Sequence, residues 1–450
     1  MDRVECGIKE VNHNPIIFKL ARSIYNFHNI NLPEKTEHQA KRVLLDTLGV
    51  GIYGASVPLY KIAVQASLKE YAAGECLVWG RKEALCASGA VFFNTLAASA
   101  TDFDEGHRTA VGHPASVVVP TALAAGRESN QSINKILSAI AVGYEIGVRF
   151  SSARDISKIE TYSTGRWGAL ASAACAAVLL KLSESQIGHA LSLAALLSPA
   201  MMGGHIDVSC GSMAKEGAAW AAQAGVKAAY LAKQGFIGPY AFLEKGNTYE
   251  TEILFSELGE TWNINRNYFK PYACCRWIHP AIDAALELKR KYEFSFDQIK
   301  AVEIDTFSRI IDMTRTRKPV NSSQAQFNLP FCLAGALFFD ELMPWHTSGE
   351  ALQNKRILNL ASSITLRAKK EFDKVFPEHI PCRVTIKTSE NSYSSRIINS
   401  PKWGDDNPAA DIELFEKFNK LAGDRSRLIW EAIMQDKLEK AKELESLILE

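Results

Sequence analysis

Residues 168–182 read GALASAACAAVLLKL, and residues 213–233 read MAKEGAAWAAQAGVKAAYLAK. Alanine has the highest helix propensity of the amino acids, and its small side chain lets neighbouring helices approach closely. Helices with this composition need other helices around them to cover their apolar faces. The sequence therefore predicts a buried, all-helical body rather than a sheet for this part of the chain.

Helical patterns extend outward from these two segments, from Ile16 to about Gly259. Ser183 and Gln186 have the spacing of a capping box at the start of a predicted helix over Glu184–Leu197. Apolar residues recur with helical spacing over Asn130–Phe150. The first half of the chain is thus predicted to be helical throughout.

The letters GxGxxG occur at Gly49, Gly51 and Gly54. In a dinucleotide-binding fold this pattern follows a strand. Here it follows the helical pattern LLDTLG of residues 44–49. We therefore interpret the glycines as sites of close helix packing and expect no dinucleotide cofactor.

The pattern changes near Trp262, and residues then alternate as in strands over Lys300–Arg309 and Pro381–Thr388. The helices predicted around these strands and after them are Ala281–Tyr292, Leu329–Phe339, Lys355–Ala361, Ile412–Leu421 and Arg425–Leu449. The predicted fold class is mainly α. A large all-helical domain is built from both chain ends, residues 1–262 and 401–450, and a smaller α+β lid domain is inserted at residues 263–400. Two domains also suit 450 residues, because a single core stops growing near ~250–300 residues.

Composition limits the partners of this chain. The formal net charge is +1, so no bulk field attracts nucleic acid or an anionic membrane. The longest apolar runs, Gly168–Leu180 and Ala190–Met202, are shorter than the ~20 residues that span a bilayer. The nine cysteines are scattered without a CxxC pair, which is typical of reduced thiols. We expect a cytoplasmic protein with no nucleic-acid or membrane partner.

Charged side chains gather in residues 102–108, DFDEGHR, which are followed by Gly112-His113-Pro114. The glycines and the proline favour a loop, and loops on rigid scaffolds often carry catalytic groups. The alternatives are a solvated charged loop and a metal site. The spacing of the histidines and carboxylates fits no established zinc or calcium pattern, so the sequence predicts no metal.

Residues 162–168, YSTGRWG, open the first alanine-rich segment. The N-terminus of a helix has free N–H groups and the positive end of the helix dipole, so it suits a carboxylate. Tyr162 and Arg166 are the candidate site residues here. The alternative is a helix cap at Thr164 with Trp167 in the core.

Lys215 lies among small and apolar residues in the second alanine-rich segment. Desolvation lowers the pKa of a lysine and can turn it into a base. The alternative is a lysine whose stem crosses apolar surface while its charge reaches water.

Residues 269–280 read FKPYACCRWIHP and lie at the predicted domain junction. Ligand sites are common between domains, and Lys270 and Arg276 could hold a carboxylate there, with His279 nearby. The alternatives are a loop whose charges face water and a cysteine nucleophile assisted by a histidine.

Short motifs from several of these segments occur in a fixed order along the chain. They are LLDxxG (44–49), DFD (102–104) with HP (113–114), GxExxxR (143–149), GSMxK (211–215), GFxGP (235–239), KPYxxC (270–275) with His279, and AQFxLP (325–330). Taken together, from about Ile16 to about Leu421, they resemble the MmgE/PrpD family. Its members include 2-methylcitrate dehydratase, cis-aconitate decarboxylase and an epimerase of iminodisuccinate.

The resemblance implies a helical domain with a smaller α+β lid, a homodimer, and an active site between the domains that needs no metal or organic cofactor. Asp102, His113, Lys215 and Lys270 match the family positions that line this site, and His107 lies in the same loop. The chain departs from the family at two points. Gly106 stands where decarboxylases and dehydratases of the family tend to have threonine, and Tyr162 stands where some members have histidine.

The resemblance implies an acid–base enzyme that acts on a small di- or tricarboxylate. A dehydratase of the 2-methylcitrate type is the first expectation. The alternatives are an epimerase of a substituted succinate, a cis-aconitate decarboxylase and a non-catalytic binding protein.

The site must neutralise carboxylates and stabilise an enolate-like intermediate, which preorganised cations can do. Lys270 and Arg276 are expected to bind substrate carboxylates, with His107, Arg166 and His279 also in the substrate-binding set. Lys215 is expected to be the general base and His113 the general acid. Asp102 would orient a histidine, and Tyr162 would act on the opposite face of the substrate.

Overall fold

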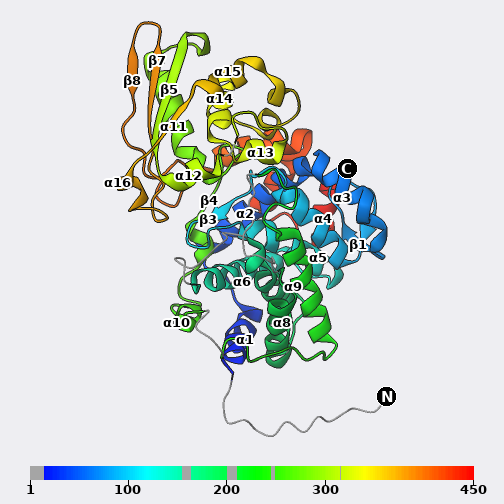
Figure 1. Ribbon diagram of the computed structural model, residues 1–450. Coiled ribbons are helices and arrows are strands. Elements are labelled where there is room, and N and C mark those ends of the chain that lie inside the picture. Colours follow the sequence, from blue (N-terminus) through cyan, green and yellow to red (C-terminus); the bar gives the residue numbers. More distant parts are fainter. Residues whose placement is uncertain (1–14, 155–163, 200–209, 245–248, 315, 450) are drawn as a thin grey trace, which may run out of the picture.

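The computed structural model describes residues 15–154, 164–199, 210–244, 249–314 and 316–449 (Figure 1). Two large hydrophobic cores organise these residues, and a small third cluster contains residues of both parts: Val50, Phe103, Ala273, Met343 and Leu421. The described residues between 16 and 269, together with residues 403–448, pack around the first core, and we call them the helical body. The described residues between 272 and 398 pack around the second core, and we call them the second body. The domain boundaries stay a prediction: one domain from residues 1–262 and 401–450, and one from residues 263–400.

The predicted mainly helical class is confirmed. The helices of the helical body are α1 (Ile16–Asn26), α2 (Glu34–Gly54), α3 (Pro58–Ser67), α4 (Ala87–Ser99), α5 (Pro114–Glu128), α6 (Ile133–Ser152), α7 (Gly168–Leu179), α8 (Glu184–Leu197), α9 (Ala218–Lys233), α10 (Thr251–Phe255), α17 (Asp411–Ala422), α18 (Ser426–Met434) and α19 (Ala441–Leu449). The chain ends meet here, because α17 packs beside α2.

The alanine-rich helix α7 is buried along its whole length, as the sequence predicts, and it packs against α9, whose opposite face is exposed at Trp220 and Lys227. A Cβ atom at Gly225 in α9 would lie only 2.2 Å from the carbonyl oxygen of Ala169 in α7. The start of α9 differs from the prediction, which placed residues 213–217 in the helix. Gly217 has a left-handed φ of 71°, so α9 begins one residue later, at Ala218.

The glycines of the GxGxxG pattern lie inside α2, and their expected role in helix packing is confirmed. A Cβ atom would lie 2.7 Å from the ring of Phe418 at Gly49, 2.2 Å from the ring of Trp79 at Gly51, and 2.0 Å from the carbonyl oxygen of Ala97 at Gly54.

Local capping explains several helix ends. Gln186 N–H donates to Ser183 Oγ (3.3 Å), and Ser183 N–H donates to Gln186 Oε1 (2.9 Å), so the predicted capping box of α8 is confirmed. The predicted helix Arg425–Leu449 is wrong in its middle. It is divided into α18 and α19 around Asp436, whose φ is 54° and whose carboxylate lies 2.7 Å from Lys41 Nζ of α2.

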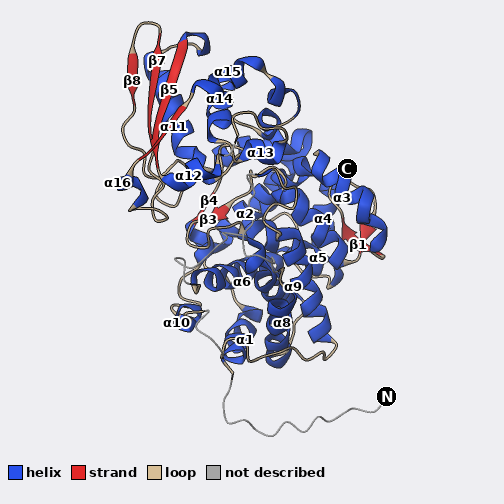
Figure 2. Cartoon of the chain, in the orientation of Figure 1, coloured by secondary structure: helices blue, strands red, loops and turns tan. Residues whose placement is uncertain are grey.

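The second body carries a four-stranded sheet, visible at the upper left of Figure 2. Its strands lie in the order β6 (Thr365–Ala368), β5 (Ile299–Thr306), β7 (Arg383–Thr388) and β8 (Ser392–Ser394). β5 and β6 are parallel, and the other pairs are antiparallel. Both strands predicted from alternation are present as β5 and β7, and their apolar side chains enter the second core.

The helices of the second body are α11 (His279–Tyr292), α12 (Ser308–Met313), α13 (Ser322–Gln326), α14 (Leu329–Phe339), α15 (Lys355–Ser363) and α16 (Lys370–Asp373). α11 packs against β7 and α14, so it lies between the sheet and the rest of this body. α13 lies at the side that faces the helical body (Figure 1).

Short strands complete the structure. β1 (Ala73–Leu77) pairs with β2 (Ala84–Leu85), and β3 (Gly106–His107) pairs antiparallel with β4 (Asn267–Tyr268). The β3–β4 pair joins the charged loop that follows α4 to the segment that leads into the second body. This pairing brings two segments that are 162 residues apart in sequence side by side, as between Gly106 and Tyr268.

In the described part of the chain, no single helix is long and apolar enough to cross a membrane. The bent pair formed by residues 34–54 and 58–70 passes that test only when both helices are counted together. Most residues of α2, the first helix of this pair, are buried in the protein.

The close contact of α7 and α9 leads to a stability prediction. Gly225→Ala places a methyl group against the Ala169 carbonyl, and such overpacking should lower the free energy of unfolding by about 1–3 kcal/mol. Lys227→Ala, at an exposed position of the same helix, should change it by less than about 0.5 kcal/mol. Urea unfolding of both variants measures the difference, and equal stabilities would show that α7 and α9 are not in this contact.

Candidate active site

A loop with unusual backbone geometry connects α4 to α5 and carries the first site residue. Asp102 is a non-glycine residue with φ of 52°, in the left-handed region that L-residues rarely adopt. Its side chain is buried. Residues held in such conformations cluster at functional sites, so the strain marks this loop as a candidate active-site element.

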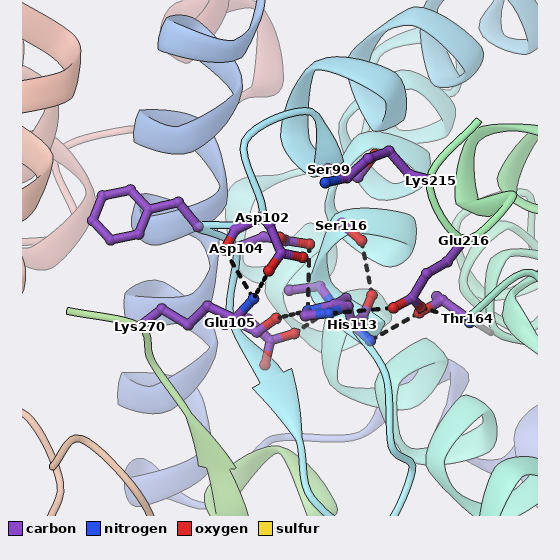
Figure 3. Close-up of polar contacts among 12 residues, drawn as sticks. Ser99, Asp102, Asp104, Glu105, His113, Ser116, Thr164, Lys215, Glu216 and Lys270 are labelled. Atoms are coloured by element: carbon purple, nitrogen blue, oxygen red, sulfur yellow. Dashed lines mark hydrogen bonds and ion pairs between the residues drawn. The ribbon is translucent and has the colours of Figure 1, made fainter. Parts of the chain in front are cut away.

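Lys270 pairs with Asp102 inside the protein. Lys270 Nζ lies 3.1 Å from Asp102 Oδ2 and donates to the Asp102 carbonyl oxygen at 2.9 Å (Figure 3). Burial opposes the ionisation of Asp102, but the charges of Lys270 and Lys215 outweigh it and lower the pKa of the carboxyl. Burial likewise opposes the charge of Lys270, yet Asp102 and Asp104 raise the pKa of this lysine. The pair is therefore ionised.

His113 occupies the cap position of α5, directly before Pro114. Its Nδ1 lies 2.7 Å from the carbonyl oxygen of Glu105, which can only accept a hydrogen bond, so Nδ1 carries a proton. Its Nε2 lies 3.7 Å from Glu216 Oε1. Burial lowers the pKa of His113, but the carboxylates of Asp104, Glu216 and Asp102 together outweigh this effect and raise the pKa above its ordinary value; Asp104 Oδ2 lies 3.5 Å from Nδ1.

Lys215 approaches the same cluster from the segment before α9. It also has a left-handed φ of 52°, and only 4% of its surface is exposed. Lys215 Nζ donates to Gln326 Oε1 of α13 at 2.5 Å. Burial lowers the pKa of Lys215, and the negative charge of Asp102 opposes this shift. The alternative of a lysine that reaches water is thus wrong.

Asp102 is the common neighbour of the three cationic side chains. Its carboxylate interacts electrostatically with Lys270, Lys215 and His113. The structure therefore brings together four residues that the sequence analysis selected, and Figure 3 shows them converging from the α4–α5 loop, the start of α5, the segment before α9 and the segment after β4.

A second buried ion pair supports the loop from behind. Lys417 Nζ of α17 lies 2.7 Å from Asp46 Oδ1 of α2 and donates to the Phe103 carbonyl oxygen at 2.8 Å. The same ammonium stands 3.9 Å from the centroid of the Phe103 ring. These contacts hold the main chain directly after Asp102.

The site has members that the sequence analysis did not select. Glu216 accepts hydrogen bonds from the main-chain N–H (2.9 Å) and the hydroxyl (2.5 Å) of Thr164, and the Thr164 hydroxyl oxygen accepts from the main-chain N–H of His113 at 3.0 Å. The other members are Asp46, Asp104, Glu105, Gln326 and Lys417. Glu216 directly follows Lys215, and Asp46 and Gln326 lie in motifs that carry the family resemblance. These positions in the sequence could have identified the three residues as candidates for the site.

Two residues predicted to bind substrate have other partners. Arg276 donates to the carbonyl oxygens of Phe269 (3.3 Å) and Pro401 (3.2 Å) and to His279 Nδ1 (3.3 Å). His279 Nε2 in turn lies 3.1 Å from the Cys274 carbonyl oxygen, and burial lowers the pKa of the ring. Their contacts fix the connections between the two bodies and give no support to a role as carboxylate clamps.

His107 faces the core rather than the lysines. Its ring lies edge-to-face with Tyr144, its Nδ1 accepts the Ala110 N–H at 3.3 Å, and burial lowers its pKa to about 3. A neutral, enclosed histidine does not suit the predicted contact with a carboxylate. Arg166 ends a short 3₁₀ turn that begins at Thr164, and its role stays a prediction. Tyr162 lies outside the described residues.

Cys275 shares the cluster but is a poor nucleophile. Burial raises the pKa of its thiol to about 12, and Asp102 adds to the shift. A thiol with this pKa is protonated near neutral pH, which makes the alternative of a cysteine nucleophile unfavourable.

Asp102, Asp104 and His113 each offer a ligand atom within 4.8 Å of the others, so this trio has the geometry of a possible cation site. Lys270 Nζ already places a positive charge 3.1 Å from Asp102 in the same cluster. A divalent ion would meet strong repulsion from this ammonium.

Comparison with known families identifies the class of protein. The family model of the MmgE/PrpD N-terminal domain matches residues 19–254, and that of the MmgE/PrpD C-terminal domain matches residues 272–438. The chain therefore belongs to the MmgE/PrpD family, as the order of its motifs predicted.

Several relatives of this chain have names that refer to cis-aconitate decarboxylase. A cis-aconitate decarboxylase-like protein of Aspergillus oryzae is 26% identical over 87% of this chain and 87% of its own length. The cis-aconitate decarboxylase of Aspergillus terreus is 26% identical over 94% of this chain and 90% of its own. The human cis-aconitate decarboxylase is 30% identical over 60% of this chain and 59% of its own. The expectation of a 2-methylcitrate dehydratase receives no specific support from these relatives.

Glu105 provides a test of the electrostatics beside the site. Its Oε1 accepts the Ala115 N–H at 2.7 Å, and burial raises its pKa to about 8. A carboxyl that holds its proton more tightly in the folded state stabilises the fold at low pH, and this stability is lost as pH rises toward the folded pKa. Between about pH 5 and 8, Glu105 should therefore lower the free energy of unfolding by about 1.4 kcal/mol for each unit of pH increase.

Glu105→Gln resembles the protonated carboxyl and should remove this slope while it retains the bond to Ala115. Urea unfolding at pH 5, 6, 7 and 8 measures the difference between the variant and the wild type. Glu70→Gln, at an exposed position, is the matched control and should keep the wild-type slope. The same slope in Glu105→Gln as in the wild type would contradict a raised pKa at Glu105.

Proposed function

We propose that the protein is a lyase that removes CO₂ from a small tricarboxylate of the cis-aconitate type, using acid–base groups of its own chain. The observation that carries this proposal is the meeting of Lys215, Lys270 and His113 around Asp102. The names of the relatives supply the substrate class and the type of reaction.

The charges of the cluster suit a substrate with several carboxylates. His113 and Lys270 lie beside the carboxylates of Asp102, Asp104 and Glu216, and Lys215 interacts electrostatically with the same three carboxylates. A polycarboxylate that enters this balanced arrangement adds negative charge, which favours the protonated forms of nearby histidine and lysine side chains. Substrate binding would thus favour protonation of the side chain that later donates its proton to carbon.

Decarboxylation requires a proton donor more than a base. The C–C bond to one carboxylate breaks, CO₂ leaves, and the electron pair spreads over the alkene toward a remaining carboxylate. A proton then bonds to carbon, so a trianion becomes a dicarboxylate. Preorganised ammonium groups of Lys270 and Lys215 would stabilise the developing enolate-like charge.

His113 is the candidate donor for this proton. Because Nδ1 is held by the Glu105 carbonyl oxygen, Nε2 is the nitrogen that can exchange a proton with a bound molecule. The raised pKa of His113 favours the imidazolium form that a donor needs near neutral pH.

Dehydration of a hydroxy-tricarboxylate is the second candidate reaction. Gly106 stands where a threonine is typical of the family, and a Cβ atom at this position would lie 2.3 Å from the hydroxyl of Tyr268. A threonine therefore cannot occupy this place while Tyr268 keeps its position, and because decarboxylases and dehydratases of the family tend to share this threonine, the departure leaves both reactions as candidates. In a dehydration, Lys215 would remove a proton from carbon and His113 would protonate the leaving hydroxyl.

The test combines substrates with variants. Incubation with cis-aconitate should release CO₂ and, in D₂O, yield a product with one deuterium on carbon, as seen by NMR. Lys215→Ala and His113→Gln should reduce the rate roughly a hundredfold or more, the usual scale of general acid–base catalysis. Lys233→Ala, at an exposed position of α9, is the control and should keep the wild-type rate.

The outcomes separate the reaction classes. Formation of an ultraviolet-absorbing alkene from 2-methylcitrate, without release of CO₂, would show that the protein is a dehydratase and not a decarboxylase. Exchange of an α-proton in a substituted succinate without a new compound class would indicate an epimerase. If both Lys215→Ala and His113→Gln turn over substrate at the wild-type rate, these residues have no catalytic role in any of these reactions.

A further inference from the structure

Gln326 reaches across the junction between the two bodies. It is the last residue of α13 in the second body, and its side chain is buried. Its Nε2 donates to Ala100 O of the helical body at 3.3 Å and to Ser322 Oγ at 3.0 Å. Its Oε1 accepts from Lys215 Nζ, also of the helical body.

These contacts fix the orientation of the Gln326 amide. A carbonyl oxygen such as that of Ala100 can only accept, so it requires the NH₂ group of the amide on its side. The other side of the amide, which faces Lys215, must then be the oxygen. A flipped amide would place NH₂ against an ammonium and oxygen against a carbonyl, which loses both bonds.

Neighbouring residues of α13 cover the same segment of the helical body. Asn321 Nδ2 donates to the Gly211 carbonyl oxygen at 3.2 Å. The Phe327 ring has its centroid 5.1 Å from Lys215 Nζ, within the range of a cation–π contact. Asn321, Gln326 and Phe327 together hold residues 211–215 from the side of the second body.

The chemistry of the acceptor matters for a lysine that exchanges protons. An amide oxygen accepts a hydrogen bond from the ammonium but carries no full charge, so it orients Lys215 without the strong stabilisation that a carboxylate would give the protonated form. The backbone at Lys215 is left-handed, and its side chain ends at the hydrogen bond to Gln326.

We propose that Gln326 is a positioning residue that holds Lys215 from the second body, so that the reactive arrangement exists only when α13 is seated on the helical body. This inference deepens the proposed function and rests on it for the role of Lys215 in turnover. The contact itself can be tested without turnover.

The test replaces the neutral acceptor by a charged one of the same shape. Gln326→Glu should raise the pKa of Lys215 by at least about one unit, because an opposite charge within hydrogen-bond distance favours the ammonium. NMR of protein labelled with ¹³C at the lysine ε carbon measures this titration, and the Lys215 signal is the one lost in Lys215→Met. Gln324→Glu, the same change on the same helix, should leave the signal at its wild-type pKa.

A second variant keeps the test decisive if Gln326→Glu does not fold. Gln326→Met has a similar length and no acceptor, so it should move the Lys215 titration to lower pH and reduce turnover at least tenfold. An unchanged Lys215 titration in a folded Gln326→Glu or Gln326→Met variant would overturn the proposal. A shifted titration in a protein that decarboxylates and dehydrates none of the tested acids would leave the positioning role in place and remove the proposed function.

Discussion

The ion pair between Lys270 and Asp102 is the constraint on which the site depends. Two charges withdrawn from water are stable only when they are paired and hydrogen-bonded, and removal of one partner leaves a costly buried charge. The surrounding structure meets this need from several directions. The β3–β4 pair sets the two segments side by side, and Lys417 with Asp46 holds the main chain at Phe103. This support allows Asp102 to persist in a strained backbone conformation.

Electrostatics then divides the roles of the three cationic groups. Lys270 is charged permanently, because its pKa is raised beside two carboxylates. The pKa of His113 is raised and that of Lys215 is lowered, so the two values move toward each other. Groups whose pKa values approach the working pH are suited to proton transfer, whereas a permanently charged group is suited to binding anions. The same buried environment therefore produces both a fixed cation and a pair of titrating groups.

The site also shows why residue type alone does not define a role. Arg276 and His279 have the charge and hydrogen-bonding capacity for a substrate carboxylate, yet main-chain carbonyl groups and each other occupy their polar atoms. Burial of the linker between the bodies requires these bonds, since unsatisfied carbonyl groups are costly there. Lys215, from a segment with equally ordinary composition, reaches the cluster because its backbone turns at a left-handed residue.

The sequence by itself determined the features that depend on local interactions. These are the mainly helical class, the capping box of α8, the close packing at Gly51 within α2, the strands β5 and β7, and the motifs that identify the family. Only the tertiary structure decided the break before α9, the division of α18 from α19, and the places of Gln326 and Glu216 beside Lys215 and His113. Periodicity reports which face of one element is apolar, whereas these features depend on contacts between residues that lie far apart in the chain.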